Sequence, residues 1–270
     1  MTIAAIILLL AALAIGAHLL LQRRRRARLL AAPLSAANKA ILVKRVPLYE
    51  KLPENLRPRL EGLVNRFLDE VTFYGAKGVE ITDDIRVTIA AQASFLIVNK
   101  PNRWFHTLRT IHIYPAAFKS KLTEIKDHVH SERDQARTGE SWAKGPVILA
   151  WDHAAFGAVA PHDGHNVVMH EFAHQLDEQT GATDGSPLLD ADHSASRWAR
   201  VFQDAYERLR EHASFGRETV MDYYGATNPA EFFAVVTEVF FERPRALRAE
   251  EPALYAELVQ YYRLDPAAWR

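Results

Sequence analysis

The feature that most constrains this chain is a pair of histidines four residues apart, His170 and His174, with Glu171 directly after the first. On an α-helix, residues i and i+4 lie on one face about a turn apart, so both imidazoles can reach one metal ion. Glu171 would project to the side where a metal-bound water would lie. The motif therefore predicts two ligands and one base. Zinc suits them because it accepts imidazole and carboxylate in tetrahedral geometry.

The alternative is a chance match on a solvated helix, since the chain contains 12 histidines. The neighbouring residues argue against it. Val167 and Val168 precede the motif and Phe172 lies within it, so the sequence favours a buried helix. Because uncompensated histidine and glutamate are costly in a buried position, the motif is better explained by a metal site.

A catalytic zinc needs a third protein ligand. The extended motif with a glycine and a third histidine fails here, because Asp177 and Thr180 occupy those positions, and this excludes a metzincin. Asp177 is interpreted either as a partner for a ligand imidazole or as a plain acid at the helix end. The remaining common choice of ligand is a carboxylate from a second helix, and Glu231 is the best candidate.

Residues 228–241 predict that second helix, with Asn228 as N-cap and Pro229 in the first position. An alternative role for Glu231 is to close a capping box with Asn228, without any metal. Glu238 lies two turns further along, roughly 10 Å away at 1.5 Å per residue. We therefore expect it to support a ligand or to pair with a buried base rather than to bind the same ion.

Longer segments resemble the Mlc titration factor A family of zinc peptidases, over roughly residues 46 to 270. The segments that carry the resemblance are residues 78–92, 114–118, 145–149, 166–177, 224–231 and 261–266. The resemblance implies a zincin-like domain related to the catalytic domain of anthrax lethal factor.

It further implies that His170, His174 and Glu231 bind one Zn²⁺ per chain, as in gluzincins, that Glu171 is the base, and that Tyr224 faces the substrate. Members are described as peptidases, at least partly aminopeptidases, that also bind a sugar-responsive transcriptional repressor.

The N-terminal segment of this chain differs from that of the soluble prototype of the family. Residues 3–21 are almost entirely Ile, Leu and Ala, and as a helix they would span about 28 Å, close to the hydrocarbon core of a bilayer. No basic residue precedes this run and five arginines follow by residue 28, which favours an anchor over a cleaved signal peptide. The alternative is an uncleaved amphiphilic leader or an artefact of the gene start. Because positive residues favour the cytoplasmic side, we expect a single-pass protein of the cytoplasmic membrane with its catalytic domain in the cytoplasm. Without the anchor it would be cytosolic.

The predicted organisation is a transmembrane anchor over residues 1–22, a basic juxtamembrane linker over 23–45 and a zinc metallopeptidase domain over 46–270. Helices are predicted near residues 60–71, 82–97 and 198–209, and strands at 110–114 and 147–151, one of them beside the substrate cleft. Helices and strands in this irregular order indicate an α+β fold.

Without the five N-terminal arginines, the remainder has 28 basic and 33 acidic residues, a net charge of −5. Such a domain is a poor nucleic-acid binder. The absence of cysteine excludes disulfides and thiolate zinc ligands.

The sequence therefore predicts a zinc peptidase that hydrolyses peptide or protein substrates with a zinc-activated water and Glu171 as general base. The alternative is a non-catalytic, membrane-tethered binding module that sequesters a transcription regulator and holds zinc only for structure.

Overall fold

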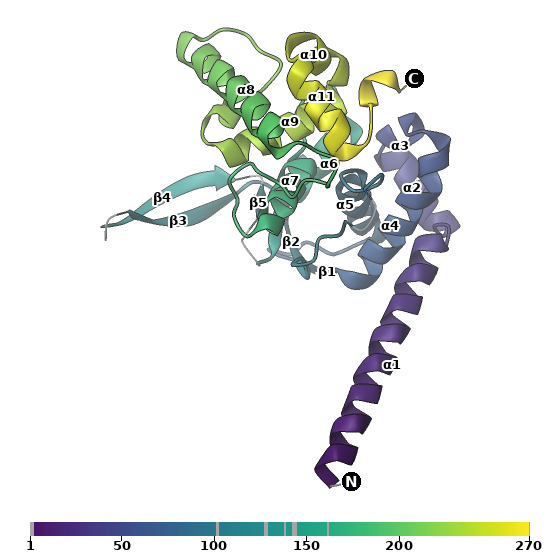
Figure 1. Cartoon of the computed structure of the whole chain (residues 1–270). Coiled ribbons are helices and arrows are strands. Elements are labelled where there is room, and N and C mark those ends of the chain that lie inside the picture. Colours follow the sequence, from purple (N-terminus) through teal and green to yellow (C-terminus); the bar gives the residue numbers. More distant parts are fainter. Residues whose placement is uncertain are drawn as a thin grey trace.

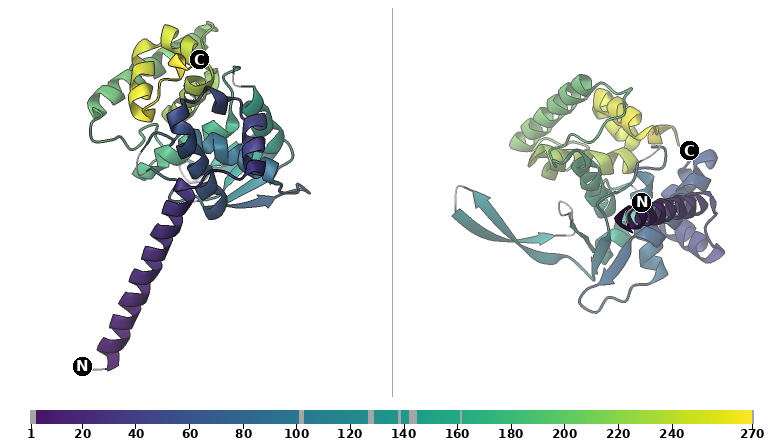
Figure 2. Two further views of the ribbon diagram at one scale, coloured as in Figure 1. Left: turned by 90° about the vertical axis from the view of Figure 1, so that its right-hand side faces the viewer. Right: turned by 60° about the horizontal axis from the view of Figure 1, so that its bottom comes forward.

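The structure, a computed structural model, describes residues 3–100, 103–126, 129–137, 139–141, 145–160 and 162–269, and for residues 3, 4, 6, 118–126, 129–137 and 139–141 it describes the backbone alone. One helix, α1 (Ile3–Ala31), projects from a domain in which helices surround a small sheet (Figure 1). The views in Figure 2 show the same projection from two other directions.

The sheet has four strands in the order β1-β2-β6-β5. The first three are parallel, with Thr72 opposite Thr110 and Ile111 opposite Val147, whereas β5 runs antiparallel to β6 at the edge. A separate two-stranded hairpin, β3 and β4, extends away from the domain (Figure 1). The strands are β1 (Thr72–Gly75), β2 (Thr110–Tyr114), β3 (Phe118–Lys126), β4 (Val129–Arg137), β5 (Gly139–Ser141) and β6 (Val147–Ala150).

Helices make up most of the domain. The α-helices after α1 are α2 (Ala36–Arg45), α3 (Leu48–Lys51), α4 (Arg57–Glu70), α5 (Asp83–Phe95), α6 (Trp151–Val159), α7 (Val167–Asp177), α8 (Ala195–Phe215), α9 (Pro229–Glu242), α10 (Pro244–Glu250) and α11 (Pro252–Tyr262). Short 3-10 turns are η1 (Glu54–Leu56), η2 (Glu178–Thr180), η3 (Tyr223–Ala226) and η4 (Pro266–Ala268).

Local sequence signals explain where the two central helices begin. Asn166 caps α7 by accepting a hydrogen bond from the backbone N–H of Met169 at 3.0 Å. Asn228 caps α9 in the same way through the N–H of Glu231, and Pro229 follows at the first helical position. Side chains that accept these otherwise unpaired donors stabilise a helix start by about 1 kcal/mol.

The core lies directly behind α7. Phe172, between the two histidines in sequence, is fully buried, and its ring centroid lies 4.8 Å from that of Phe105 and 5.6 Å from that of Phe67. On the other side, Phe240 of α9 stacks on Tyr262 at 5.3 Å. Aromatic packing on both sides therefore fixes α7 and α9 relative to the rest of the domain.

The helices predicted near residues 60–71, 82–97 and 198–209 are confirmed as α4, α5 and α8, and the two predicted strands as β2 and β6. Both strands lie inside the sheet. The edge strand that packs beside α7 is β5, which sequence reasoning did not identify. The predicted combination of helices and strands agrees with a structure that is mostly helical and contains a small, mainly parallel sheet.

The N-terminal segment is one continuous helix past the arginines. Within the described residues, one helix, Ile7–Ala31, is long and apolar enough to cross a bilayer by its length and composition. The segment predicted as a linker, residues 23–45, comprises the last turns of α1 and the helix α2. Its Leu34 and Leu42 are buried in the core of the domain.

Candidate metal centre

The two histidines of α7 present their rings on one side of the helix. Their ring centroids lie 4.9 Å apart, and each side chain is only 13% exposed. This is the arrangement that i, i+4 spacing predicts. The cap at Asn166 supports it because the helix begins one turn before His170.

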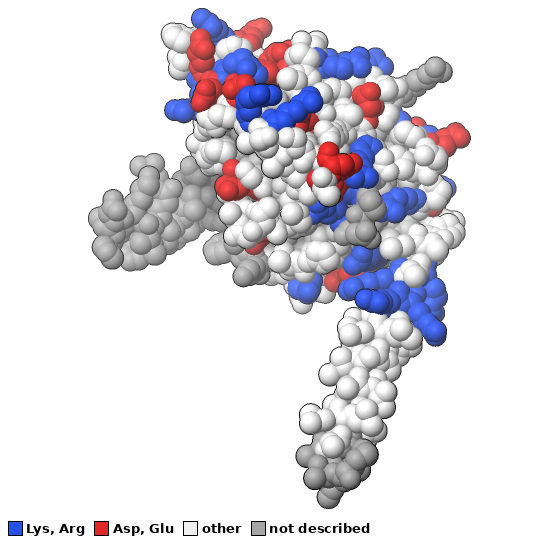
Figure 3. Space-filling model, viewed as in Figure 1, with Lys and Arg blue, Asp and Glu red and all other residues white. Residues whose placement is uncertain are grey.

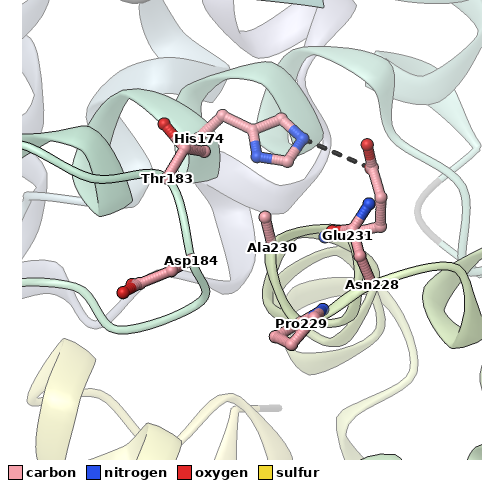
Figure 4. A pocket seen from close by; sticks show the side chains of 7 residues that line it. All are labelled: His174, Thr183, Asp184, Asn228, Pro229, Ala230 and Glu231. Atoms are coloured by element: carbon pink, nitrogen blue, oxygen red, sulfur yellow. Dashed lines mark hydrogen bonds and ion pairs between the residues drawn. The ribbon is translucent and has the colours of Figure 1, made fainter. Parts of the chain in front are cut away.

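Glu231 of α9 meets both imidazoles. Its Oε2 lies 3.0 Å from Nε2 of His170 and 3.3 Å from Nε2 of His174 (Figure 4 shows the second contact). Burial alone would raise the pKa of the Glu231 carboxyl, but hydrogen bonds from the two histidines hold it well below its usual range. Because the side chain is directed at the imidazoles, Glu231 contributes only its backbone N–H to the cap at Asn228.

One ligand atom each from His170, His174 and Glu231 forms a suitable donor set for a metal ion, since all three atoms lie within 4.8 Å of one another. A metal held tetrahedrally at about 2.0–2.1 Å from each donor requires donor separations of about 3.3 Å. The separations between Glu231 and the two histidines match that value. Two imidazole nitrogens and one carboxylate also leave a fourth position for a further ligand.

Glu238 lies behind His170. His170 Nδ1–H donates to Glu238 Oε1 at 2.7 Å, and Glu238 Oε2 accepts a hydrogen bond from the backbone N–H of Asn166. A carboxylate at Nδ1 keeps the proton there, so the lone pair of Nε2 faces the metal position. Burial opposes a charged imidazole, but the charge of Glu238 and hydrogen bonds to Glu231 and Glu238 raise the pKa of His170 well above its usual value.

Glu171 is the third functional group of α7. Its side chain is 5% exposed, and Oε2 has no hydrogen-bond partner among the described residues. Burial raises the pKa of its carboxyl to about 7, although His170 and His174 act in the opposite direction. A carboxyl near neutrality beside a metal position has the proton affinity that a general base needs.

Tyr224 lies in the turn η3, which packs against α9. Its ring centroid is 6.0 Å from that of His170, and the residue is 54% exposed. The backbone N–H of Tyr224 donates to Asp222 Oδ1 at 2.6 Å, which fixes the start of the turn. The structure thus brings the ring of Tyr224 beside that of His170.

A pocket of about 410 Å³ opens next to His174 and Glu231 (Figure 4). Its other lining residues are Thr183, Asp184, Asn228, Pro229 and Ala230. One wall is therefore the first turn of α9, and the opposite wall is the loop that follows α7.

Asp177 holds that loop in place. Its side chain is fully buried at the end of α7, and Oδ2 accepts a hydrogen bond from the N–H of Gly185 at 2.7 Å. Gly185 has φ +80°, and a Cβ there would lie 2.4 Å from the carbonyl oxygen of Pro229. Asp177 therefore connects α7, the pocket loop and α9. The sequence left its role open, because its partner lies eight residues away in an irregular loop.

Comparison with known proteins places this geometry in context. Residues 20–263 match the family described as glucose-regulated metallo-peptidase M90. An uncharacterized protein of Synechocystis sp. is 41% identical over 244 residues, covering 90% of this chain and 89% of the relative. Mlc titration factor A of Salmonella arizonae is 32% identical over 229 residues, covering 82% and 89%. That of Klebsiella pneumoniae is 30% identical over 232 residues, covering 83% and 85%.

Proposed function

The chain belongs to the glucose-regulated metallo-peptidase M90 family, and from this premise we propose that it is a zinc-dependent peptidase of the gluzincin type with a zincin-like catalytic domain. The observation that carries the proposal is the convergence of His170, His174 and Glu231 beside the buried carboxyl of Glu171.

Zinc is the metal that this donor set suits best. Two neutral imidazoles and one carboxylate are typical ligands of catalytic zinc, and the chain has no cysteine to form a closed thiolate site. When bound, zinc supplies Lewis-acid activation of a water and stabilises negative charge on the substrate.

The side chains of the protein then account for the proton transfers. Glu171 accepts a proton from the attacking water and later delivers it to the leaving amine, since a buried carboxyl holds a proton more strongly than an exposed one. Tyr224 donates a hydrogen bond to the developing oxyanion. Glu238 holds the His170 ring in the orientation and tautomer that binding requires.

The substrate is a peptide or protein that enters the pocket beside His174. The edge strand β5 packs beside α7, and an extended peptide can add its backbone to such an edge. The aminopeptidase preference implied by the family resemblance is part of this proposal.

A second candidate function follows from the relatives named Mlc titration factor A. That name points to binding of a regulator called Mlc, and a corresponding transcriptional repressor is a candidate partner of this chain. In the non-catalytic version of this function, zinc would be structural and Glu171 would have no chemical role.

The location that we propose is the cytoplasmic membrane. Helix α1 would cross the bilayer once, and the arginines that follow the apolar run would keep the catalytic domain in the cytoplasm. The anchor would also restrict any partner or substrate to those that reach the membrane surface.

Metal removal and reconstitution test the proposed activity. The chain treated with chelator should lose peptide hydrolysis and recover it with one equivalent of zinc. Glu231→Gln should not recover, because two imidazoles alone bind zinc too weakly. Full hydrolysis by the metal-free chain, or by Glu231→Gln without zinc, would contradict the proposal.

A further inference from the structure

Polar side chains of α4 form hydrogen bonds with the backbone of the residues that follow α1. The backbone N–H of Leu34 donates to Glu61 Oε2 at 3.2 Å, within the buried part of the domain. Asn65 Nδ2 donates to the carbonyl oxygens of Ala32 at 2.9 Å and Pro33 at 3.2 Å. Two of these three contacts therefore fix the carbonyls of the two residues that directly follow α1.

Two arginines of α1 form ion pairs with acidic residues of α4. Arg25 pairs with Asp69 at 2.5 Å and Arg26 with Glu70 at 2.7 Å. Exposed ion pairs of this kind each contribute little stability, but they add geometric constraints to the joint, meaning the contact of residues 25–34 with α4. Together the contacts extend along α4 from Glu61, in its second turn, to Glu70 at its end.

The closest approach is between backbones. A Cβ added to Gly62 would lie 2.1 Å from the carbonyl oxygen of Leu30 and 2.8 Å from its Cα. No side chain fits in that space, so α1 rests directly on α4 at this point. A contact between two helix backbones leaves little freedom for rocking.

Nothing in the sequence supplies a hinge between this joint and the apolar part of α1. Residues 17–32 contain neither glycine nor proline, and the helix is continuous from Ile3 to Ala31. Sharp helix kinks almost always arise at such residues or at a distortion of the backbone ladder.

We propose that α1 and the catalytic domain form one rigid body, so that a bilayer holding α1 also holds the metal centre in a single orientation and at a fixed height. This inference rests on the proposed membrane anchoring for its biological meaning, but the rigidity of the joint is a property of the chain alone.

The arginine cluster at the joint then has two faces. Arg25 and Arg26 pair with α4, and Arg23, Arg24 and Arg28 are exposed. Figure 3 shows basic side chains gathered where α1 leaves the domain. At 100° per residue, Arg23 falls on the same side of α1 as Leu30, whereas Arg24 and Arg28 fall on the side away from Leu30 and Arg26. Their chemical partner in this arrangement is the anionic headgroup of a phospholipid.

The fixed pose also bears on substrates. Helices α8 to α11 lie at the far end of the domain from the free part of α1 (Figures 1 and 2), so α9, which carries Glu231, is on that side. Substrates would have to reach the site at the height that the joint sets. A flexible tether would allow the site to sample the membrane surface.

Distance measurements between two spin labels test the joint. Because the chain has no cysteine, Leu20→Cys on α1 and Ala199→Cys on α8 can be labelled without further changes. Both positions are exposed. In detergent micelles, the labelled chain should give a single narrow distance distribution, and a broad or multiple distribution would overturn the proposal.

Two glycine substitutions provide a matched pair. Gly62→Ala should widen the distribution by about twofold or more, or shift it, because the joint loses its one packed arrangement. Gly16 lies in α1 itself, but a Cβ there would meet nothing within 4 Å. In Gly16→Ala the distance distribution should therefore stay narrow. Equal distance distributions in Gly62→Ala, Gly16→Ala and the parent would contradict the role of the contact between Gly62 and Leu30.

Asn65→Ala gives an independent readout if Gly62→Ala folds poorly, because it removes the contacts at the end of α1 without a steric clash. Asn65→Ala too should widen the distance distribution, and an unchanged distribution would count against the joint.

Vesicles containing anionic phospholipid allow the same distance measurement in a bilayer. Peptide hydrolysis in all variants should equal that of the parent, so failure of the joint and failure of the proposed activity are separable.

Discussion

Glu238 and His170 are joined by a 2.7 Å hydrogen bond between Oε1 and Nδ1, although they lie on different helices. The second oxygen of the same carboxylate binds the backbone N–H of Asn166 at the start of α7. One side chain of α9 therefore fixes both the helix that carries the histidines and the orientation of one ring. Such outer partners tune metal affinity without touching the metal.

Glu238→Gln should weaken zinc binding by about 10- to 100-fold, because the amide has only one oxygen for two N–H donors. The donor left without an acceptor is buried, which adds a cost of about 1–3 kcal/mol to folding. Competition with a chromophoric chelator measures the zinc affinity. Unchanged affinity would mean that Glu238 does not position His170.

Glu242 supplies a matched control one turn further along α9. Its Oε2 accepts a hydrogen bond from the N–H of Gly164 at 3.0 Å, and burial raises the pKa of its carboxyl to about 9. It is therefore protonated at neutral pH, and glutamine has nearly the same shape and hydrogen-bonding groups. Glu242→Gln should leave zinc affinity unchanged.

The same variant should change how stability depends on pH. Between the usual carboxyl pKa of 4.5 and about 9, the folded chain keeps the Glu242 proton and the unfolded chain loses it. The free energy of unfolding should therefore fall as pH rises through this window, by on the order of 1 kcal/mol per pH unit. Below pH 4.5 this contribution is constant.

Urea unfolding of metal-free parent and Glu242→Gln at pH 6 and pH 8 measures the effect, since other groups titrate alike in both. Stability should fall less in Glu242→Gln between the two pH values. Parallel losses would show that Glu242 ionises normally in the folded chain.

Asp177→Ala should loosen the pocket loop while leaving zinc in place. The buried N–H of Gly185 would lose its acceptor, which destabilises the fold by about 1–3 kcal/mol. The KM for peptides should rise because one wall of the pocket is no longer fixed. Asp184→Ala, with its exposed side chain, is the stability control and should stay within about 0.5 kcal/mol of the parent. Equal stability of both variants would refute the bracing role of Asp177.

Two truncations locate the boundary between anchor and domain. A chain beginning at residue 22 should be soluble without detergent, active and as stable as the parent, because it keeps the contacts of α1 with α4. A chain beginning at residue 35 loses the buried Leu34 and leaves Glu61 with one partner fewer. Its Tm should fall by about 5 °C or more. Equal Tm values would mean that residues 22–34 do not belong to the domain.

The sequence predicted the metal-centre helices well because their signals are local. The i, i+4 spacing of the histidines and the caps at Asn166 and Asn228 depend only on neighbouring residues. The choice between the two roles of Glu231 was not local, since it depends on where α9 packs. The structure directs its carboxylate to the two imidazoles rather than to the cap.

Other features had no local signal. Strands β1 and β5, with the sequences TFYG and GES, are short and lack the apolar run that predicted the equally short β6. The partner of Glu238 follows from the packing of α9 on α7, and that of Asp177 from the path of a loop. The apolar run and its arginines predicted the N-terminal helix, but its joint with α4 depends on a glycine 32 residues beyond Leu30.

Glu171 is proposed to perform acid–base chemistry at a zinc site. The most direct measurement is peptide turnover by Glu171→Gln with its zinc content determined on the same sample. Because glutamine keeps the shape but cannot accept the proton, zinc should remain stoichiometric while kcat falls by about 10²- to 10⁴-fold. Turnover equal to that of the parent, at full zinc occupancy, would contradict the catalytic account and leave a zinc-containing binding module.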